Sequence, residues 1–207
     1  METESAEIRE LLSGAAKGDR SAIEALFALH RDELRRAVAL RLDDRLAPRC
    51  DASDVVQQVC LEAARRLPDF LGRQEIPFRL WLRGLARDKL IQLHRRHLAA
   101  DKRAAAREIP ALPVDSSADF VRGVLDRELS PSQALIATEL AERLRIALGE
   151  LDDDERELIL WRHFEQLSNG EVAALLQIND AAASKRYVRT LEKLRGLLKG
   201  LGVTGPG

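Results

Sequence analysis

Residues 167–199, LSNGEVAALLQINDAAASKRYVRTLEKLRGLLK, constrain the fold most, because they specify two helices and the turn between them. Ser168 and Glu171 have the spacing of a capping box, in which a hydroxyl and a carboxylate satisfy free backbone N–H groups at a helix start. The run Gln177-Ile178-Asn179-Asp180 then interrupts the apolar pattern and offers two residues that can cap a second helix. The segment therefore predicts a short helix, a tight turn and a longer helix.

The second of these helices has two different sides. At 100° per residue, Lys185 and Arg189 point away from an apolar face formed by Ala183, Tyr187, Leu191 and Leu194. Together with a small buried residue at Ala173 and a buried Ile178, this pattern is typical of a helix-turn-helix whose second helix enters a DNA major groove. The same spacing also fits an ordinary helical hairpin with a solvated basic side, and spacing alone leaves both open.

Composition favours helices throughout the 207-residue chain. Aromatic residues make up only 4% of it and charged residues 32%, and the bias towards Leu, Ala, Arg and Glu predicts an all-α fold. The net charge of −1 conceals a basic segment at residues 79–107, where Lys and Arg far outnumber the two acidic residues, Asp88 and Asp101. Basic charge is therefore local, which favours a confined nucleic-acid contact over a uniformly basic surface.

No sequence pattern points to an enzyme. The chain lacks a nucleophile elbow, a phosphate loop, an HExxH motif and a paired Cys/His site. Cys50 and Cys60 are expected to be reduced thiols, and His30 lies on the apolar side of its helix, where a structural histidine is favoured over a metal ligand. We therefore expect no catalytic residue, no cofactor and no metal. The acidic N-terminus and the absence of long apolar runs predict a cytoplasmic protein without membrane contact.

The first half of the chain predicts a helical domain at residues 1–97. Amphipathic helices are expected at 4–17 and 20–42, and a third begins near Asp51 and stops at Pro68. Asp51 or Ser53 can cap this third helix. Capping does not explain the polar stripe that continues along it, which suits docking to a basic partner. The stripe consists of Asp54, Gln57, Gln58 and Glu62.

A loop at residues 68–77 and a basic helix from Phe78 to about His97 follow. Loops that carry aromatic residues and Arg suit the capture of single-stranded bases. The predicted basic side of the helix holds Arg79, Arg83, Arg87 and Lys89. Phe78 and Trp81 fit two roles, contact with bases or anchoring of the core, and the second is the commoner role at this spacing.

Residues 98–130 lack sustained periodicity and predict an interdomain linker with a short helical piece around residues 120–126. The second domain is expected at residues 131–200. Ser130 caps its first helix, with Pro131 at the first helical position, and this helix runs to about Leu148. The run at residues 152–154 opens the next helix, and N-terminal capping by these aspartates is favoured over cation binding.

The motifs resemble those of the extracytoplasmic-function (ECF) sigma factors of bacterial RNA polymerase. The similar pieces occur in the family's order and are DASDVVQQVCLEAARRLPDF, FRLWLRGLARDKLIQLHRR and LDDDERELILWRHFEQLSNGEVAALLQINDAAASKRYVRTLEKLR. The segments SPSQA and AAASKRYVR resemble the branch abundant in planctomycete-type bacteria. The chain departs from the family pattern at Ser53, Gln58, Asp88 and Gln177. At Gln177 the family usually has Gly, the residue that most easily adopts positive φ.

The resemblance implies partners and a role for each motif. The implied partners are core RNA polymerase, through its beta-prime clamp and beta subunits, promoter DNA and an anti-sigma factor. Residues implied in polymerase binding are Asp51, Asp54, Gln57 and Gln58. Residues implied in capture of the melted minus-ten strand are Phe70, Arg73, Gln74, Phe78, Arg79, Trp81, Arg83 and Arg87. Residues implied in reading the minus-thirty-five element are Ser184, Lys185, Arg186 and Arg189.

A different function remains compatible with the same residues. A stand-alone transcription regulator would bind duplex DNA through the helix-turn-helix and dimerise through the N-terminal domain. It would bind duplex DNA tightly without a polymerase, at two half-sites about one helical turn apart. A sigma factor is expected to bind duplex DNA poorly on its own, so the two functions separate in a binding experiment.

Overall fold

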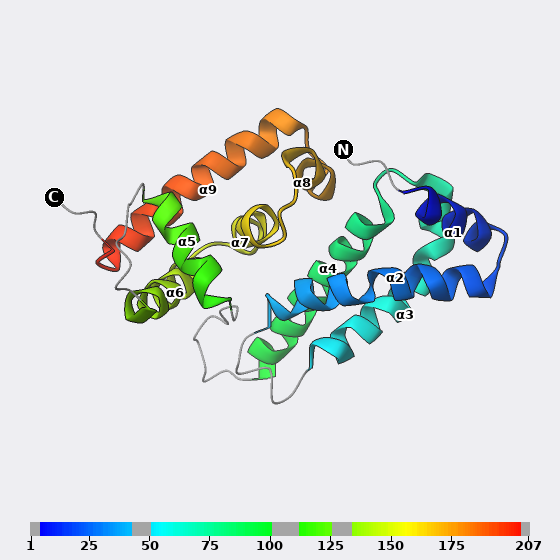
Figure 1. Ribbon diagram of the computed structural model, residues 1–207, viewed down its shortest axis with the longest axis horizontal. Coiled ribbons are helices and arrows are strands. Elements are labelled where there is room, and N and C mark those ends of the chain that lie inside the picture. Colours follow the sequence, from blue (N-terminus) through cyan, green and yellow to red (C-terminus); the bar gives the residue numbers. More distant parts are fainter. Residues whose placement is uncertain (1–4, 43–50, 101–111, 126–133, 204–207) are drawn as a thin grey trace. The chain divides into compact units, whose positions relative to one another are not determined.

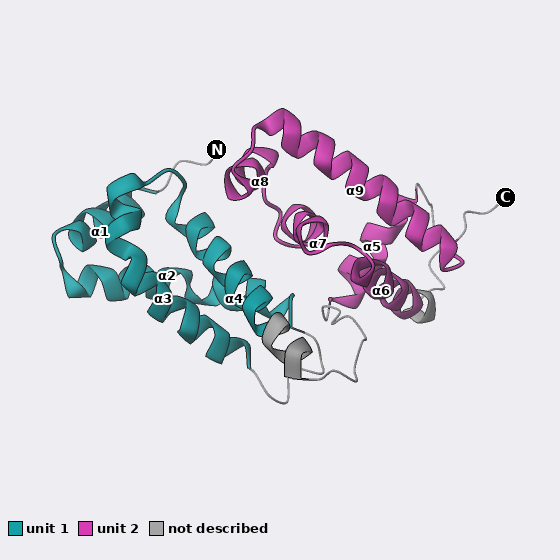
Figure 2. Cartoon of the chain, turned by 180° about the vertical axis from the view of Figure 1, so that it is seen from behind, with its two compact units in different colours: residues 1–105 teal, residues 106–207 magenta. Residues whose placement is uncertain are grey.

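The computed structural model describes residues 5–42, 51–100, 112–125 and 134–203, and every regular element within these ranges is helical (Figure 1). The prediction of an all-α fold is therefore confirmed. The chain divides into two compact units, residues 1–105 and 106–207 (Figure 2). The boundary between them falls inside the predicted linker. What each unit does stays a prediction at this point.

Unit 1 contains α1 (Ala6–Ala16), α2 (Arg20–Ala39), α3 (Ala52–Arg73) and α4 (Phe78–Ala100). The Ser5 hydroxyl caps α1 by accepting from the Ile8 N–H at 3.3 Å, and the Asp19 carboxylate caps α2. Helices α1 and α2 approach closely at Gly14, where a Cβ atom would lie 2.8 Å from the Cβ of Ala22. Glycine is therefore required for this helix crossing.

Helices α2, α3 and α4 pack against one another (Figure 1), and a cluster of rings lies where they meet. Phe78 is fully buried, and its ring centroid lies 5.8 Å from Phe27 on α2 and 5.5 Å from Phe70 on α3. The buried ring of His30 lies 5.4 Å from Phe78, so His30 is a core residue, as its apolar helix face predicted. Burial of these rings joins three helices around one centre.

The predicted loop at residues 68–77 is wrong over most of its length, because α3 passes through Pro68 and ends at Arg73. Proline removes one backbone hydrogen bond, to the carbonyl of Ala64. Ala64 and Pro68 both face solvent, where water can satisfy that carbonyl. On the opposite side Leu67 and Phe70 are buried, and their packing favours continuation of the helix.

Unit 2 contains α5 (Val114–Val124), α6 (Ala134–Gly149), α7 (Asp153–Ile159), the π-helical turn η1 (Leu160–Phe164), α8 (Asn169–Leu176) and α9 (Asp180–Gly200). Trp161, Leu144 and Leu194 are among its fully buried side chains. Asp152 caps α7 through a complete capping box with Glu155, which confirms the capping role predicted for the aspartate run.

The predicted linker needs correction, because α5 lies inside residues 98–130 and belongs to the core of unit 2. It buries Ala118, Phe120, Val121 and Val124 against the other helices. The Arg195 side chain of α9 also donates to the Val124 carbonyl at 2.7 Å. The expected helical piece at residues 120–126 captured only the end of α5, because Pro113 and the pair Ser116-Ser117 at its start are typical of a linker. Ser130 and Pro131 lie outside the described residues.

Candidate nucleic-acid interface

Helices α8 and α9 form the helix-turn-helix that the sequence predicted. The Ser168 hydroxyl accepts from the Glu171 N–H at 3.3 Å, and the Glu171 carboxylate accepts from the Ser168 N–H at 2.7 Å. Asn179 caps α9 by accepting from the Ala182 N–H at 2.8 Å. These caps satisfy some of the free N–H groups at both helix starts and fix where each helix begins.

The turn between the helices is made without glycine. Gln177 adopts a left-handed conformation with φ of 54° and ψ of 42°, and the Ile178 N–H donates to the Ala173 carbonyl at 3.0 Å. Ala173 is buried, as predicted. Ile178 is half-buried, so its predicted burial is only partly realised. The Gln177 N–H also donates to the Ala174 carbonyl at 3.2 Å. These two hydrogen bonds hold a glutamine in a backbone conformation that glycine would adopt more easily.

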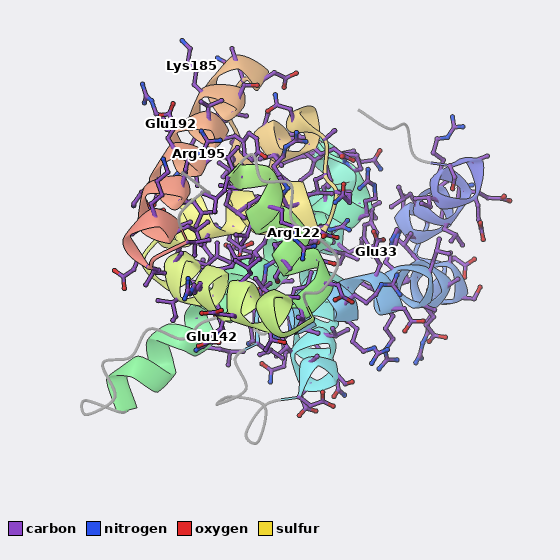
Figure 3. The ribbon with its side chains drawn as sticks, turned by 60° about the vertical axis from the view of Figure 1, so that its left-hand side comes forward. Glu33, Arg122, Glu142, Lys185, Glu192 and Arg195 are labelled. Carbon is purple, nitrogen blue, oxygen red and sulfur yellow. The ribbon has the colours of Figure 1, made fainter. Side chains whose placement is uncertain are left out.

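The outward side of α9 carries the cations that periodicity placed there. Ser184, Lys185 and Arg189 are exposed, whereas Ala183 and Leu194 are fully buried on the opposite side. Figure 3 shows the Lys185 side chain extending from the end of α9 away from the helix. Val188 also lies exposed on this helix, with 52% of its surface accessible. This face can reach phosphates and base edges.

Arg186 differs from these neighbours because it pairs with α7. Its guanidinium lies 2.8 Å from the Asp154 carboxylate, and Lys193, two turns further along α9, lies 2.5 Å from the Glu155 carboxylate. The family resemblance implied that Arg186 reads the minus-thirty-five element together with Ser184, Lys185 and Arg189. The acidic residues at 152–155 are the sequence signal for this pairing. Helix capping already explained their presence, so their ion pairs with α9 were not predicted.

Tyr187 of α9 shares a hydrogen bond with His163 of η1. Burial, followed by the charge of Arg162, lowers the pKa of His163 to about 4, so the imidazole is neutral at pH 7. Burial raises the pKa of Tyr187, and Arg162 partly offsets this. The Arg162 guanidinium lies 5.3 Å from the centre of the Tyr187 ring. Sequence reasoning missed this cluster, because no local spacing links residues 163 and 187.

The predicted docking stripe lies on the exposed side of α3. Asp51, Asp54, Gln57 and Gln58 are all exposed, while Val55, Val56 and Val59 are buried behind them. Asp51 occupies the N-cap position of α3, yet its side chain makes no capping hydrogen bond. Glu62, the last residue of the predicted stripe, is half-buried and pairs with Arg66 at 2.6 Å, and its neighbour Leu61 is 56% exposed. An accessible acidic and amide surface with an apolar end suits a protein partner.

The residues predicted to capture single-stranded DNA divide into exposed and buried groups. Arg73 and Gln74 are exposed, and Arg79, Trp81 and Arg87 are half-buried. Phe70, Phe78 and Arg83 are buried, with exposed fractions of 7%, 0% and 7%. The expectation that Arg83 lies on the outside is wrong, because its guanidinium pairs with Glu33 of α2 at 2.6 Å. Phe70 stacks on Trp81 with ring centroids 4.6 Å apart, so it packs inside unit 1.

Three other findings concern metal binding, membrane spanning and the cysteine within the described residues. No group of three or more His, Cys, Asp or Glu side chains in this part of the chain is arranged to hold a metal ion. None of the described helices is long and apolar enough to cross a membrane. The Cys60 thiol is half-buried and free, and burial raises its pKa. Cys50 and the side chains of His94 and His97 lie outside the described part.

Comparison with known proteins gives consistent matches over nearly the whole chain. A family model described as "ECF sigma factor" matches residues 5–198. The RNA polymerase sigma factor CnrH of Cupriavidus metallidurans is 31% identical over 192 residues, which cover 92% of this chain and 93% of that protein. The ECF RNA polymerase sigma factor SigL of Mycobacterium tuberculosis is 31% identical over 193 residues, covering 93% and 98%. The solved structure of CnrH in complex with the cytosolic domain of CnrY matches with a TM-score of 0.57 at 26% identity, covering 94% of this chain and 98% of that chain.

Proposed function

This chain belongs to the ECF sigma factor family, and on that premise we propose that its two units divide promoter recognition between them. The protein binds core RNA polymerase and directs it to promoters at transcription initiation. Unit 1 holds the polymerase and the melted minus-ten strand. Unit 2 reads the minus-thirty-five element. The outward cationic face of α9 on a well-capped helix-turn-helix is the observation that carries this division most directly.

The proposal for unit 2 rests on which residues of α9 can reach a major groove. Ser184, Lys185 and Arg189 are exposed, and α9 is fixed by capping at Asn179. Lys and Arg contact either phosphates or guanine edges, and only contacts with base edges carry sequence information. Lys185 and Arg189 lie four residues apart on one side of α9, so one groove can receive both.

The proposal for unit 1 places the polymerase on α3. Asp51 and Asp54 supply exposed negative charge, and Gln57 and Gln58 supply exposed amides on the following turn. The three buried valines behind them hold this surface on a rigid helix. Surface charge of this kind contributes mainly to the rate and orientation of association. The beta-prime clamp is the polymerase element that the resemblance assigns to this surface.

Strand capture in unit 1 is assigned to the exposed and half-buried members of the predicted set. Arg73, Gln74 and Arg79 surround the short α3–α4 connection, and Trp81 offers a half-buried ring nearby in the sequence. Base flipping costs a few kcal/mol of unstacking, and stacking on an aromatic or Arg surface returns about 1–3 kcal/mol per base. Phe70 and Phe78 support this region from inside the core.

The chain is proposed to have no catalytic chemistry of its own. Sigma factors are not enzymes, and the polymerase forms the phosphodiester bonds. The site of action follows that of the polymerase, in the cytoplasm. CnrH was solved with the cytosolic domain of CnrY bound, and we infer that a regulatory protein also binds this chain.

Reconstitution tests the function. The full-length chain is combined with core RNA polymerase and with fragments of the genome that encodes it, and transcripts are mapped. Promoter-dependent initiation that requires the chain is expected. Absence of such transcripts on every fragment, together with tight binding of the free chain to duplex DNA at two half-sites, would instead support a stand-alone regulator.

The polymerase-binding surface is tested by reversing its charge. Asp51→Lys with Asp54→Lys should abolish co-purification with core polymerase while leaving the helical content unchanged. A matched control reverses two exposed carboxylates elsewhere in unit 1, Asp32→Lys with Asp69→Lys. Equal retention of polymerase by both double variants would remove α3 from the proposed interface.

A further inference from the structure

We propose that Arg186 is a positioning residue, held by Asp154 of α7, and that it sets the recognition helix so that Lys185 and Arg189 face outward. Duplex DNA binding by unit 2 is taken from the proposed function. What is added here is a role for α7: its acidic first turn increases the affinity of α9 for DNA without contacting DNA itself.

Two ion pairs join α9 to α7 along one flank. The Arg186 guanidinium lies 2.8 Å from the Asp154 carboxylate, and the Lys193 ammonium lies 2.5 Å from Oε2 of Glu155. The same Glu155 oxygen accepts the Asp152 N–H at 3.0 Å as part of the capping box. Lys193 is therefore attached to a carboxylate that the backbone of α7 already holds in place.

The spacing of the two pairs matters for the orientation of α9. Arg186 and Lys193 are seven residues apart, which is two turns or roughly 10 Å along the helix. Thr190 lies between them, fully buried, and its hydroxyl donates to the Arg186 carbonyl at 2.9 Å. The buried side chains of Ala183 and Leu194 hold the same helix from its apolar side. Two pairs on either side of a buried residue resist both rotation and tilt.

The competing explanation is that Arg186 binds a DNA phosphate and that Asp154 competes with the DNA for it. The two explanations predict opposite changes in DNA affinity for the same substitution, Asp154→Asn. If Asp154 positions Arg186, then Asp154→Asn weakens DNA binding, because the recognition helix loses an attachment. If Asp154 competes, then Asp154→Asn strengthens binding, because the guanidinium is released to the phosphate.

The experiment uses the full-length chain in holoenzyme and a promoter duplex recovered by the reconstitution described above. Asp154→Asn should weaken binding about three- to five-fold, the scale of one partly exposed ion pair. The double variant Asp154→Arg with Arg186→Asp should recover most of the binding, because it rebuilds the pair with its charges exchanged. A matched control, Glu142→Gln, breaks a pair with Arg145 that lies within α6, and should leave binding unchanged.

Salt dependence provides a readout that distinguishes positioning from phosphate contact. Loss of a phosphate contact lowers the slope of log affinity against log salt by about 1, whereas loss of a positioning residue leaves it unchanged. Stronger or unchanged binding by Asp154→Asn overturns the inference. So does Arg186→Gln if it lowers the slope by about 1 and the exchanged pair fails to restore binding.

Failure of the proposed function gives a different result. In that case the wild-type holoenzyme recovers no promoter at all. The same variants are then measured as free full-length chains on a short mixed-sequence duplex, where the sign of the Asp154→Asn effect still decides between positioning and competition.

Discussion

Helices α4 and α9 both carry cations at helical spacing, but the two cations that periodicity places on the outward side of α9 are exposed, and one of those predicted on α4 is buried. Lys185 and Arg189 are exposed on α9, whereas Arg83 of α4 is only 7% exposed and pairs with Glu33 at 2.6 Å. Helix α9 contacts α6, α7 and α8, but its buried residues, which include Ala183 and Leu194, lie on one side. Helix α4 packs against both α2 and α3, so few of its sides remain free. Periodicity therefore predicts the outward side of a helix whose buried residues share one side, and it fails for a helix that is buried on several sides.

Substitution of Phe78 is expected to have the largest effect, and it tests directly whether α4 buries residues that were predicted to contact DNA. Because its ring is fully buried among Phe27, Phe70 and Trp81, Phe78→Ala should lower the free energy of unfolding by about 3–5 kcal/mol. Urea denaturation followed by helical circular dichroism measures the change. Leu61→Ala, an apolar truncation at an exposed site on α3, should change stability by less than about 0.5 kcal/mol.

The opposite result would mean that Phe78 contacts DNA. A Phe78→Ala variant with wild-type stability and defective promoter melting would mean that the ring leaves the core to stack on a base. The comparison between α4 and α9 would then fail, since both helices would present their predicted residues to DNA.

On α9 the expected effect is on binding and not on folding. Arg189→Ala should weaken promoter binding by about 1–3 kcal/mol if the side chain contacts a base edge, and should relax sequence preference at that base pair. Thermal stability should stay within about 0.5 kcal/mol of the wild type, because Arg189 is exposed. Binding to a panel of single-base promoter variants measures both quantities. A loss of stability equal to the loss of binding would show that α9 is as enclosed as α4.

Arg83→Met tests whether this cation of α4 stabilises the fold instead of binding DNA. Methionine keeps much of the buried volume but leaves Glu33 without its guanidinium partner, and we expect unfolding to become easier by about 1–2 kcal/mol at pH 7. The control Lys89→Met removes a half-buried charge from the same helix and should cost less than about 0.5 kcal/mol. Promoter binding measured at equal folded concentration should be unchanged by Arg83→Met.

The stability contributed by the ion pair between Glu33 and Arg83 should decrease in acid. Burial alone would raise the pKa of Glu33, but the charge and hydrogen bond of Arg83, with smaller contributions from His30 and Arg79, outweigh it and lower the pKa below 4.5. Since the folded form prefers the carboxylate, its stabilisation is present above pH 4.5 and is lost as the pH falls through the lowered value. The difference between wild type and Arg83→Met should therefore shrink in acid. A difference that stays constant from pH 7 to pH 3 would contradict the ion pair's role.

The sequence predicted those parts of the fold that depend on neighbours along the chain. Capping boxes at Ser168 and Asp152 and the Asn179 cap act over three residues, so they can be read directly. The path of α3 through Pro68 could not be read in this way, because it depends on Phe70 packing against Trp81 of another helix. The same holds for Arg83 with Glu33, which are 50 residues apart. Local signals define where helices start, and packing between helices decides which side chains remain for function.

Gln177 gives the smallest expected effect and concerns the turn that α9 depends on. Left-handed backbone is unfavourable for a residue with a Cβ atom by about 1–2 kcal/mol, so Gln177→Gly removes strain at a φ of 54°. Glycine also gains more freedom in the unfolded chain, which offsets part of this, and a net stabilisation of about 0.5 kcal/mol is expected. The control Gln92→Gly, in the ordinary helical backbone of α4, should instead destabilise by about 1 kcal/mol. Denaturation midpoints at constant slope measure both, and destabilisation by Gln177→Gly would mean that the glutamine side chain contributes more to the turn than its backbone strain costs.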